Sequence, residues 1–370
     1  MPVPFTSRNL LHEKGKLALS VAGVAAAIAL ILLLLGFREG LYATLTAYAD
    51  NLDTDLIVPQ SGVEGLFSSD STLPLALHHE AVQATGATEA GHILLADVIF
   101  TSGETKTPIL LVGYDPALPF GSPWKLGAGR LLEADDEILI DSWLAERAGA
   151  LPGDEIELLG GSFTVVGLTR ETASWMSPYM FITLDAAETV LGAYGMVSYH
   201  LLRLPEGADV ESARRAIEGR VEGVEVLTPA EVAGADRRVI ATIMDTPLNV
   251  MLVIGVVIGI AVTGLTAYTA VTDRMRKYGV LKAIGAGDGR LARLVVGETL
   301  VRAGMGFVAG IGFSYLAAAL IMARWAQFNI VIRGGSLVQA GGLALVMSLV
   351  AGLLPVRRVA QIDPLIVFKE

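Results

Sequence analysis

The sequence contains no cysteine and has few charged residues for its length. Without cysteine, neither a disulfide framework nor a thiolate metal site can form in this 370-residue chain. Only 18% of the residues are charged and 53% are hydrophobic, whereas charged residues make up about 25% of soluble domains. The mean hydropathy is +0.57. Disulfide-rich, collagenous and disordered classes are therefore excluded, and an ordinary soluble enzyme is disfavoured.

The sequence also lacks the motifs of common catalytic sites. It contains no G-x-x-x-x-G-K-[ST], no H-E-x-x-H and no G-x-S-x-G, so we predict that this chain has no catalytic residue and binds neither a cofactor nor a metal. The five histidines include one adjacent pair, His78-His79. Adjacent side chains on a helix point in different directions, so a solvated surface pair is favoured there over a metal site.

Charge is distributed unevenly along the chain. From Arg38 to Asp245 there are 12 basic and 32 acidic residues, a net charge of −20, while the remainder has a net charge of +9. An acidic central block therefore separates two basic, apolar ends. The acidity favours solubility of that block, with attraction of cationic ligands as a weaker alternative.

Four segments are long and apolar enough to cross a hydrocarbon core about 30 Å thick, which takes roughly 20 helical residues. The third segment contains Glu298 and Arg302, and the fourth is followed by Pro355. We predict an α-helical membrane protein with four transmembrane helices. The segments are Leu17–Phe37, Leu248–Val271, Leu294–Ala323 and Leu337–Leu354.

Lysine and arginine counts in short loops predict the orientation. The N-terminal stretch has three such residues, the loop between spans two and three has six, and the C-terminal tail has three. The loop after span three has only Arg324 and Arg333. Both termini and the loop between spans two and three are therefore predicted to be cytoplasmic, in the cell membrane. A cleaved signal peptide is the alternative for span one, but its 21 apolar residues exceed the roughly 7–15 of a signal core.

The acidic block alternates strand-like and helix-like patterns, which is typical of an α+β domain. Gly160-Gly161 lies between two predicted strands and indicates a two-residue hairpin turn. We expect an extracytoplasmic domain inserted between helices one and two, with mixed or antiparallel sheets in two lobes. Strands are predicted at 91–100, 108–114, 137–141, 155–159, 162–168, 199–204 and 224–227, and helices at 142–148 and 210–219.

The segments that join this domain to the spans also have helical patterns. Residues 39–49 can continue span one, and residues 229–244 lead directly into span two, with Pro247 expected in its first turn. Stiff helical connections would pass movement of the spans to the domain. The predicted order is a cytoplasmic amphipathic segment (1–16), span one (17–37), the α+β domain (38–246), span two (247–271), a cytoplasmic coupling loop (272–293), span three (294–323), an external loop (324–336), span four (337–354) and a cytoplasmic tail (355–370).

Polar and small residues within the spans limit the chemistry of the membrane part. The spans contain no Asp and no His, so an intramembrane protease is excluded. Glu298 and Arg302 have i, i+4 spacing, and they are either a functional pair or a self-neutralising pair that orients the helix. Small residues at four-residue spacing allow close helix packing, at Gly255 and Gly259 and at Gly306 and Gly310.

The loop between spans two and three carries the most specific pattern. It is basic, and it has a helical part at Arg274–Ile284 followed by a glycine-rich break. Met275, Tyr278 and Leu281 would share one face of this helix, suited to a groove in a cytoplasmic partner. A plain positive loop is the alternative, because basic charge alone satisfies the orientation rule.

Three stretches resemble one family of membrane proteins. Residues 274–287 (RMRKYGVLKAIGAG), with Gly297-Glu298 in the next span, resemble the signature of FtsX-like permeases, the membrane subunits of type VII ABC transporters. Residues 355–364 (PVRRVAQIDP) resemble the closing motif of that family, and residues 145–167 resemble its extracytoplasmic core. The order of one span, an outer domain and three spans is similar to that of the MacB, lipoprotein-release and DevC-type group.

The resemblance implies a permease subunit without its own ATPase motifs. It implies that a separate ABC ATPase, holding ATP and Mg²⁺, docks on the coupling loop, and that its cycle moves the outer domain by mechanotransmission. Two ATPase copies, a second permease copy in a homodimer, membrane lipid, and a periplasmic adaptor or outer-membrane channel are the implied partners, without nucleic acid. The implied coupling residues are Arg276, Tyr278, Gly279, Leu281, Lys282, Ala283, Gly285 and Ala286.

Two other functions remain open from the sequence. An FtsX-like regulator would transport nothing and would transmit force to a cell-wall hydrolase. A membrane-anchored sensor would use the acidic domain as a receptor and would have no associated ATPase. Export or extraction of a substrate is favoured over both, and the sequence does not identify that substrate.

Overall fold

The structure, a computed structural model, describes residues 14–67, 71–103, 105–172, 177–284, 286–325 and 328–360. The chain divides into two compact units. The helical unit comprises residues 1–40, 245–325 and 330–370, and the α+β unit comprises residues 41–244 and 326–329. Most of the predicted N-terminal segment and the end of the C-terminal tail lie outside the described residues, as does Gly285.

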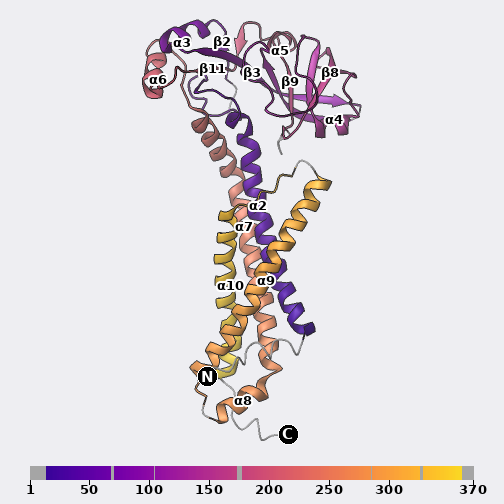
Figure 1. The fold of residues 1–370 in the computed structure, drawn as a ribbon, viewed down its shortest axis with the longest axis vertical. Coiled ribbons are helices and arrows are strands. Elements are labelled where there is room, and N and C mark those ends of the chain that lie inside the picture. The colour runs from indigo at the N-terminus through magenta and orange to yellow at the C-terminus, as the bar shows by residue number, and fades with distance from the viewer. Residues whose placement is uncertain are drawn as a thin grey trace. The chain divides into compact units, whose positions relative to one another are not determined.

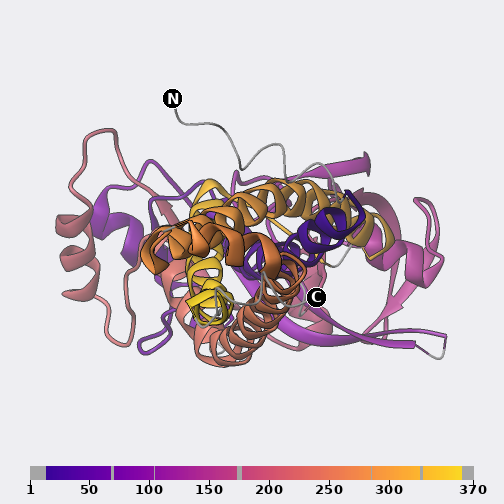
Figure 2. The same ribbon diagram turned by 90° about the horizontal axis from the view of Figure 1, so that it is seen from below.

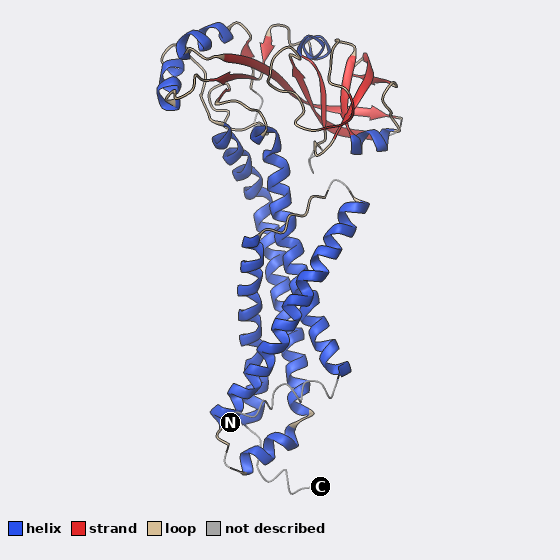
Figure 3. Cartoon of the chain, in the orientation of Figure 1, coloured by secondary structure: helices blue, strands red, loops and turns tan. Residues whose placement is uncertain are grey.

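In the described part of the chain, four helices are long and apolar enough to cross a membrane. Along the chain, a short helix, α8 (Met275–Ala283), comes between the second and the third of them; Figures 1 and 3 show it at the lower end of these helices. The predicted fold class, four such helices with an α+β domain between the first two, is confirmed. The long helices are α2 (Lys14–Asp50), α7 (Pro229–Thr272), α9 (Asp288–Arg324) and α10 (Gly334–Ala360).

Helix α2 supplies most of the buried side chains of one hydrophobic cluster in the helical unit, and Figure 2 shows these helices from below. Its side chains Ile28 and Ile31 are completely buried. Val256 of α7, Phe307 of α9 and Met347 of α10 contact the cluster that they form. Many apolar side chains on the outer faces of α7, α9 and α10 are exposed instead. Buried contacts therefore concentrate around α2, and the outer faces have the composition that lipid or another helix can cover.

The long helices extend beyond the predicted spans. Helix α2 continues to Asp50 and α7 begins at Pro229, so the expected helical connections are confirmed. Pro247 lies inside α7 and not in its first turn, and Pro355 lies inside α10 and does not end it. The prediction for Pro247 is therefore wrong, and α10 continues past Leu354, the predicted end of span four.

The α+β unit is built on one continuous sheet. Within the described ranges it has nine strands. Eight of them follow the order β1-β11-β3-β4-β9-β6-β8-β5, and the ninth, β7, pairs with the first residues of β8. The pairs β4–β9 and β6–β8 are parallel, and the other neighbours are antiparallel. The strands are β1 (Leu56–Val58), β3 (Glu89–Ser102), β4 (Thr105–Tyr114), β5 (Leu126–Gly129), β6 (Glu137–Asp141), β7 (Glu155–Leu158), β8 (Gly161–Thr169), β9 (Tyr179–Thr183) and β11 (Tyr199–Arg203).

Alternate residues of the strands face two different cores. Along β4, Ile109 and Leu111 belong to one hydrophobic cluster, and Leu110 and Val112 belong to the other. This alternation is the period-two pattern of a sheet covered on both faces. The expectation of two lobes is therefore wrong, since a single sheet runs through the unit. A small second sheet pairs β2 (Leu73–Pro74) with β10 (Met196–Val197).

Four short helices cover the first face of the sheet. Buried side chains of each helix join the same cluster, for example Ala81 of α3 and Ile217 of α6. Side-chain caps begin three of these helices, such as Asp141, whose carboxylate accepts from the Trp143 N–H at 2.8 Å. The helices are α3 (Leu77–Thr85), α4 (Ser142–Ala148), α5 (Leu184–Leu191) and α6 (Val210–Glu218).

The second face of the sheet is covered by the ends of α2 and α7. Tyr48 and Ala49 of α2 and Val232 of α7 pack there against strand residues such as Phe181 and Leu201. The C-terminal end of α2 and the N-terminal end of α7 therefore belong to the core of the α+β unit.

The predicted strands and helices of this unit agree closely with the observed ones. The β7–β8 turn is displaced by one residue, because Leu159 and Gly160 occupy the two turn positions, both with positive φ, as a type I′ turn requires. Residues 224–227 do not form a regular strand: Leu227 makes an isolated bridge to Ile57 of β1, and Val224 makes one to Gln60, just after β1.

Candidate functional site

Three buried charged residues join the beginning of α8 to α9. The Glu298 carboxylate lies 3.3 Å from Nη1 of Arg274 and 3.3 Å from Nη2 of Arg302. All three residues are more than nine-tenths buried. A buried carboxylate between two guanidinium groups is strongly coupled to both of them, because little water screens the charges. The predicted Glu298–Arg302 pair is thus part of a larger cluster. The contact between Arg274 and Glu298 was not predicted, because Arg274 lies in the loop between spans two and three, 24 residues before Glu298.

The apolar face of α8 is turned toward its own chain. Tyr278 is buried, and Met275 and Leu281 pack with it against Leu291 and Val295 of α9. These α8 residues do share one face, as expected from their spacing. The expectation that this face is offered to a partner is wrong, because α9 already covers it. Burial raises the pKa of the Tyr278 hydroxyl to about 12, so the group stays protonated.

The opposite face of α8 is exposed. Ile284 is 76% exposed and Val280 is 42% exposed, and both lie next to the exposed basic residues Arg276 and Lys277. Ala283 is exposed on the same face. Two large apolar side chains on a solvent-facing basic helix are unusual for a surface that remains solvated. We call Arg276, Lys277, Val280, Ala283 and Ile284 the outer face of α8.

The remaining predicted coupling residues hold the loop together. Gly279 is buried, and Ala286 packs against the α8–α9 cluster. The Lys282 ammonium lies 3.0 Å from the Asp288 carboxylate at the beginning of α9. Gly285 lies outside the described residues.

The predicted packing glycines lie at close helix contacts with α2. A Cβ atom on Gly306 would come within 2.5 Å of Val24, and one on Gly310 would come within 2.9 Å of the Ala25 carbonyl oxygen. A Cβ on Gly259 would overlap Met347, whereas one on Gly255 would meet Leu30 only at 3.4 Å. Helix α9 therefore approaches α2 at a distance that only glycine permits.

In the α+β unit, the end of α2 is anchored by an aromatic cluster. The Tyr48 hydroxyl donates to the Gly121 carbonyl oxygen at 3.1 Å, and its ring is completely buried. The rings of Trp124, Tyr179 and Phe181 surround it, with centroids 5.5–6.4 Å away. Buried aromatic rings with a satisfied hydroxyl form a rigid attachment.

The beginning of α7 is anchored by a different set of contacts. The buried Asp236 carboxylate accepts from the backbone N–H groups of Leu66 and Phe67, each at 3.1 Å. One residue before the helix, Thr228 forms a capping box with Glu231, in which each residue accepts from the backbone N–H of the other.

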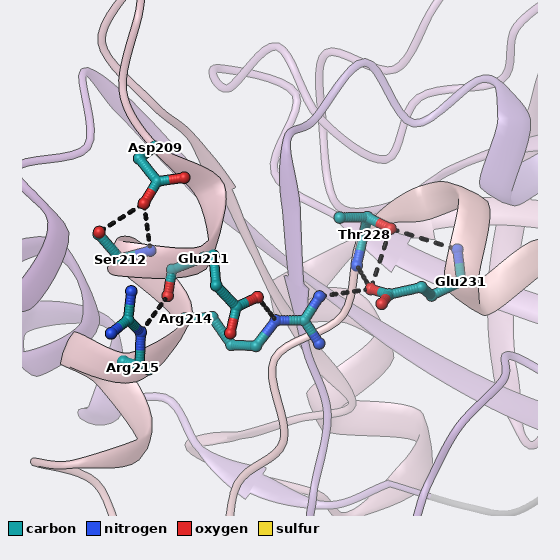
Figure 4. Close-up of polar contacts among 7 residues, drawn as sticks. All are labelled: Asp209, Glu211, Ser212, Arg214, Arg215, Thr228 and Glu231. Atoms are coloured by element: carbon teal, nitrogen blue, oxygen red, sulfur yellow. Dashed lines mark hydrogen bonds and ion pairs between the residues drawn. The ribbon is translucent and has the colours of Figure 1, made fainter.

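Arg214 of α6 ties this capping box to the rest of the domain. Its Nη2 lies 2.7 Å from the Glu231 carboxylate, and its Nε lies 3.4 Å from Glu211. Figure 4 shows this row of contacts from Asp209, at the beginning of α6, across to Thr228. The capping box, Arg214 and the Asp236 contacts hold the beginning of α7 on the α+β unit.

Close to the domain the two long helices also pack on each other. Tyr42 and Leu45 of α2 contact Ile240 and Met244 of α7. The Arg237 guanidinium lies 4.9 Å from the centre of the Tyr42 ring, in cation–π range. We call residues 41–50 and 229–244 the stalk.

The structure brings together most of the histidines. His78 lies in the first turn of α3, and His92 and His200 are paired directly across β3 and β11. One ring nitrogen from each of these three residues lies within 4.8 Å of the others. Of the histidines in the described ranges, only His79 is exposed, so the expectation of a solvated His78-His79 pair is wrong for His78.

All three clustered rings are neutral at pH 7. Burial, which outweighs the hydrogen bond to the Pro74 carbonyl oxygen, together with repulsion from the rings of His92 and His78 lowers the pKa of His200 to about 4. Burial likewise lowers the pKa of His78 and His92, with added repulsion from His79 and His78 respectively. Neutral imidazole is the form that binds metals.

Two family models match the chain. The MacB-like periplasmic core domain matches residues 17–220, and the FtsX-like permease C-terminal region matches residues 249–364. The first match covers more than half of the sequence and extends over α2 and the strands and helices of the α+β unit through α6. The second covers the region from α7 to the C-terminal tail.

Curated relatives share this organisation. An uncharacterized ABC transporter permease of Mycobacterium tuberculosis (strain ATCC 25618 / H37Rv) is 21% identical over 365 residues, which is 98% of this chain and 97% of that protein. The macrolide export ATP-binding/permease protein MacB of Rhodospirillum rubrum is 23% identical over 397 residues, 97% of this chain and 58% of that protein.

A solved structure is also similar to part of the chain. It is the extracellular domain of the noncanonic ABC-type transporter YknZ from Gram-positive bacteria. The match has a TM-score of 0.37 and 16% identity, and it covers 48% of this chain and 100% of that one.

Proposed function

From the premise that this chain belongs to the family of ABC transporter permeases with a MacB-like periplasmic core domain and an FtsX-like C-terminal region, we propose that it couples ATP hydrolysis by a separate ATPase subunit to movement of its α+β unit. The chain is a membrane permease subunit of MacB-like type, and the family implies an ABC ATPase partner. The resemblance seen in residues 145–167, 274–287 and 355–364 is thereby confirmed.

The outer face of α8 is the proposed ATPase contact, and its exposure is the observation that carries the proposal. Val280 and Ile284 project from a helix whose other face is held on α9 by Tyr278. A helix fixed on one side and apolar on the other fits a hydrophobic groove in a partner. Arg276 and Ala283 extend this contact, while the buried Tyr278 and Gly279 and the half-buried Leu281, Lys282 and Ala286 position α8.

Movement of α8 would reach the long helices through the buried charges. Arg274 adjoins α8, and Glu298 and Arg302 belong to α9. Displacement of α8 therefore pulls on α9, and α9 contacts α2 at Gly306 and Gly310. Since α2 and α7 end in the core of the α+β unit, their movement changes the position of that unit in this proposal.

The proposed assembly contains two permease copies and two ATPase subunits. The exposed apolar faces of α7, α9 and α10 supply surface for the second permease copy as well as for lipid. We place both termini and α8 in the cytoplasm, because twelve basic residues lie on that side and two on the other. The α+β unit then lies outside, where it would act in export or extraction of a substrate.

Substitution of the outer face of α8 tests the docking role. We expect Ile284→Asp to lower ATPase activity of the assembled complex more than tenfold, because it puts a charge in the apolar contact. The experiment uses the full-length permease with the ATPase that co-purifies with it from native membranes. Leu131→Asp, at an exposed leucine of the α+β unit, is the matched control and should leave that activity unchanged.

Two results would count against the docking role. One is normal co-purification and ATPase activity with Ile284→Asp. The other is equal loss with Leu131→Asp. Because Ile284 has an exposed side chain, the variant should insert and fold normally, which size-exclusion chromatography in detergent checks.

A further inference from the structure

The histidine cluster of the α+β unit joins three separate elements at one point. His92 and His200 lie side by side on neighbouring strands, on the face of the sheet that α3 covers, and His78 approaches them from α3. The ring centroids of His78 lie 5.7 Å from His92 and 6.3 Å from His200. No part of the ATPase coupling described above uses these residues, so the cluster requires its own explanation.

Each ring of the cluster has an orphaned nitrogen. The Nδ1 atoms of His78, His92 and His200 are buried and have no hydrogen-bond partner among the described residues. A buried polar atom without a partner costs about 1–3 kcal/mol, so native folds rarely retain one. Three buried nitrogens of this kind, on three rings that each place one nitrogen within 4.8 Å of the others, fit a shared ligand.

The orientation of His200 favours a metal ion as that ligand. Its Nε2 lies 3.2 Å from the Pro74 carbonyl oxygen, and this nitrogen must donate, because a carbonyl can only accept. In the neutral ring the Nδ1 atom then carries the lone pair and can bind a metal ion. A metal-binding histidine is typically held in this way, with its second ring nitrogen donating to a backbone carbonyl.

We propose that His78, His92 and His200 bind a divalent transition metal of the zinc type in the α+β unit. Imidazole nitrogens suit Zn²⁺, Cu²⁺ and Ni²⁺, whereas Mg²⁺ and Ca²⁺ require oxygen ligands. Three histidines leave a fourth tetrahedral position for water or for a donor from another molecule. This site is independent of the proposed ATPase coupling.

The cluster is compact enough to surround one metal ion. A tetrahedral Zn²⁺ with bonds of about 2.0–2.1 Å holds its ligand atoms within the 4.8 Å that encloses one ring nitrogen of each histidine. The hydrogen bond to Pro74 holds the buried ring of His200, and the half-buried rings of His78 and His92 complete the site. The bound metal would tie α3 to β3 and β11 and would stabilise this end of the domain.

Zinc binding to the full-length chain tests the proposal. The tag-free protein in detergent is treated with chelator, dialysed, and titrated with ZnCl₂ against a chromophoric zinc indicator. We expect one Zn²⁺ per chain, displaced neither by Mg²⁺ nor by Ca²⁺. His78→Gln and His92→Gln should each weaken binding more than about tenfold, because loss of even an indirect partner of a metal ligand costs that much. His79→Gln, at the exposed neighbour, is the matched control and should leave the affinity unchanged.

A second measurement does not depend on the variants. Co²⁺ added to the wild-type chain should give the visible absorption of a tetrahedral site, and Zn²⁺ should remove it. No Zn²⁺ bound at one equivalent and no such Co²⁺ spectrum would show that the rings enclose water only, which overturns the proposal. Equal weakening by His78→Gln and His79→Gln would overturn it as well.

Discussion

At the residue scale, Glu298 lies in a buried cluster of charges in the helical unit. Its carboxylate forms ion pairs with two buried guanidinium groups, those of Arg274 and Arg302. The i, i+4 spacing was enough to predict the Arg302 contact, because both residues lie on one helix. Arg274 could not be predicted, since the turn between α7 and α8 brings it back to α9.

The Glu298→Gln variant should destabilise the helical unit. Loss of one partner of a buried ion pair leaves an uncompensated buried charge and costs about 3–5 kcal/mol. Here two guanidinium groups lose their shared negative charge. The midpoint of SDS-induced unfolding in detergent, followed by tryptophan fluorescence, measures the change.

Asp288→Asn is the control for this prediction. Asp288 is an acidic residue of the same helix, but its ion pair with Lys282 is largely exposed, with 57% of the Asp288 side chain accessible. Its loss should cost less than about 1 kcal/mol. Equal effects of the two substitutions would contradict a special role for the buried cluster.

The histidines show the limit of prediction for single residues. His78-His79 was the only pair visible in the sequence, and the separation of its side chains argued against a metal site. The partners of His78 are His92 and His200, which the register of β3 and β11 brings together. That register depends on pairing between strands far apart in the chain, so the local sequence could not reveal it.

At the element scale, the sequence predicted helix α8 but not which of its faces is covered by the rest of the chain. The spacing of Met275, Tyr278 and Leu281 indicated an amphipathic helix, and the observed bounds differ from the predicted ones by one residue at each end. Which side of the helix is covered depends on Leu291 and Val295, after the glycine-rich break.

The contact between α9 and α2 gives a testable consequence of the glycine positions. Gly310→Ala would place a Cβ atom 2.9 Å from the Ala25 carbonyl oxygen, and a backbone atom cannot yield easily. We expect a loss of about 1–3 kcal/mol from overpacking. The same SDS unfolding experiment measures it.

Gly312→Ala is the matched control on the same helix. A Cβ at Gly312 has no atom within 4 Å among the described residues. This variant should be neutral or more stable by up to about 1 kcal/mol, because alanine has the higher helix propensity. If Gly310→Ala were as stable as Gly312→Ala, the close approach of the two helices would be refuted.

At the scale of the whole molecule, the fold class followed from the distribution of charge and apolar residues. Four apolar segments and an acidic block of alternating patterns were sufficient to predict the helices and the α+β domain. The single sheet in place of two lobes could not be predicted, because the β4–β9 and β6–β8 pairs join distant segments. The anchors at Tyr48 and Asp236 were missed for the same reason, since their partners lie in distant loops.

The central claim is that α8 faces the cytoplasm, where ATP is, and that the α+β unit acts on the other side of the membrane. Because the chain has no cysteine, single-cysteine variants report sidedness without background. Ala283→Cys on α8 and Glu222→Cys in the α+β unit introduce thiols at exposed positions. The measurement is labelling of intact cells, with their outer layers made permeable, by a maleimide that does not cross the cell membrane. The account predicts labelling of Glu222→Cys in intact cells and of Ala283→Cys only after the cell membrane is opened, and labelling of Ala283→Cys in intact cells would contradict it.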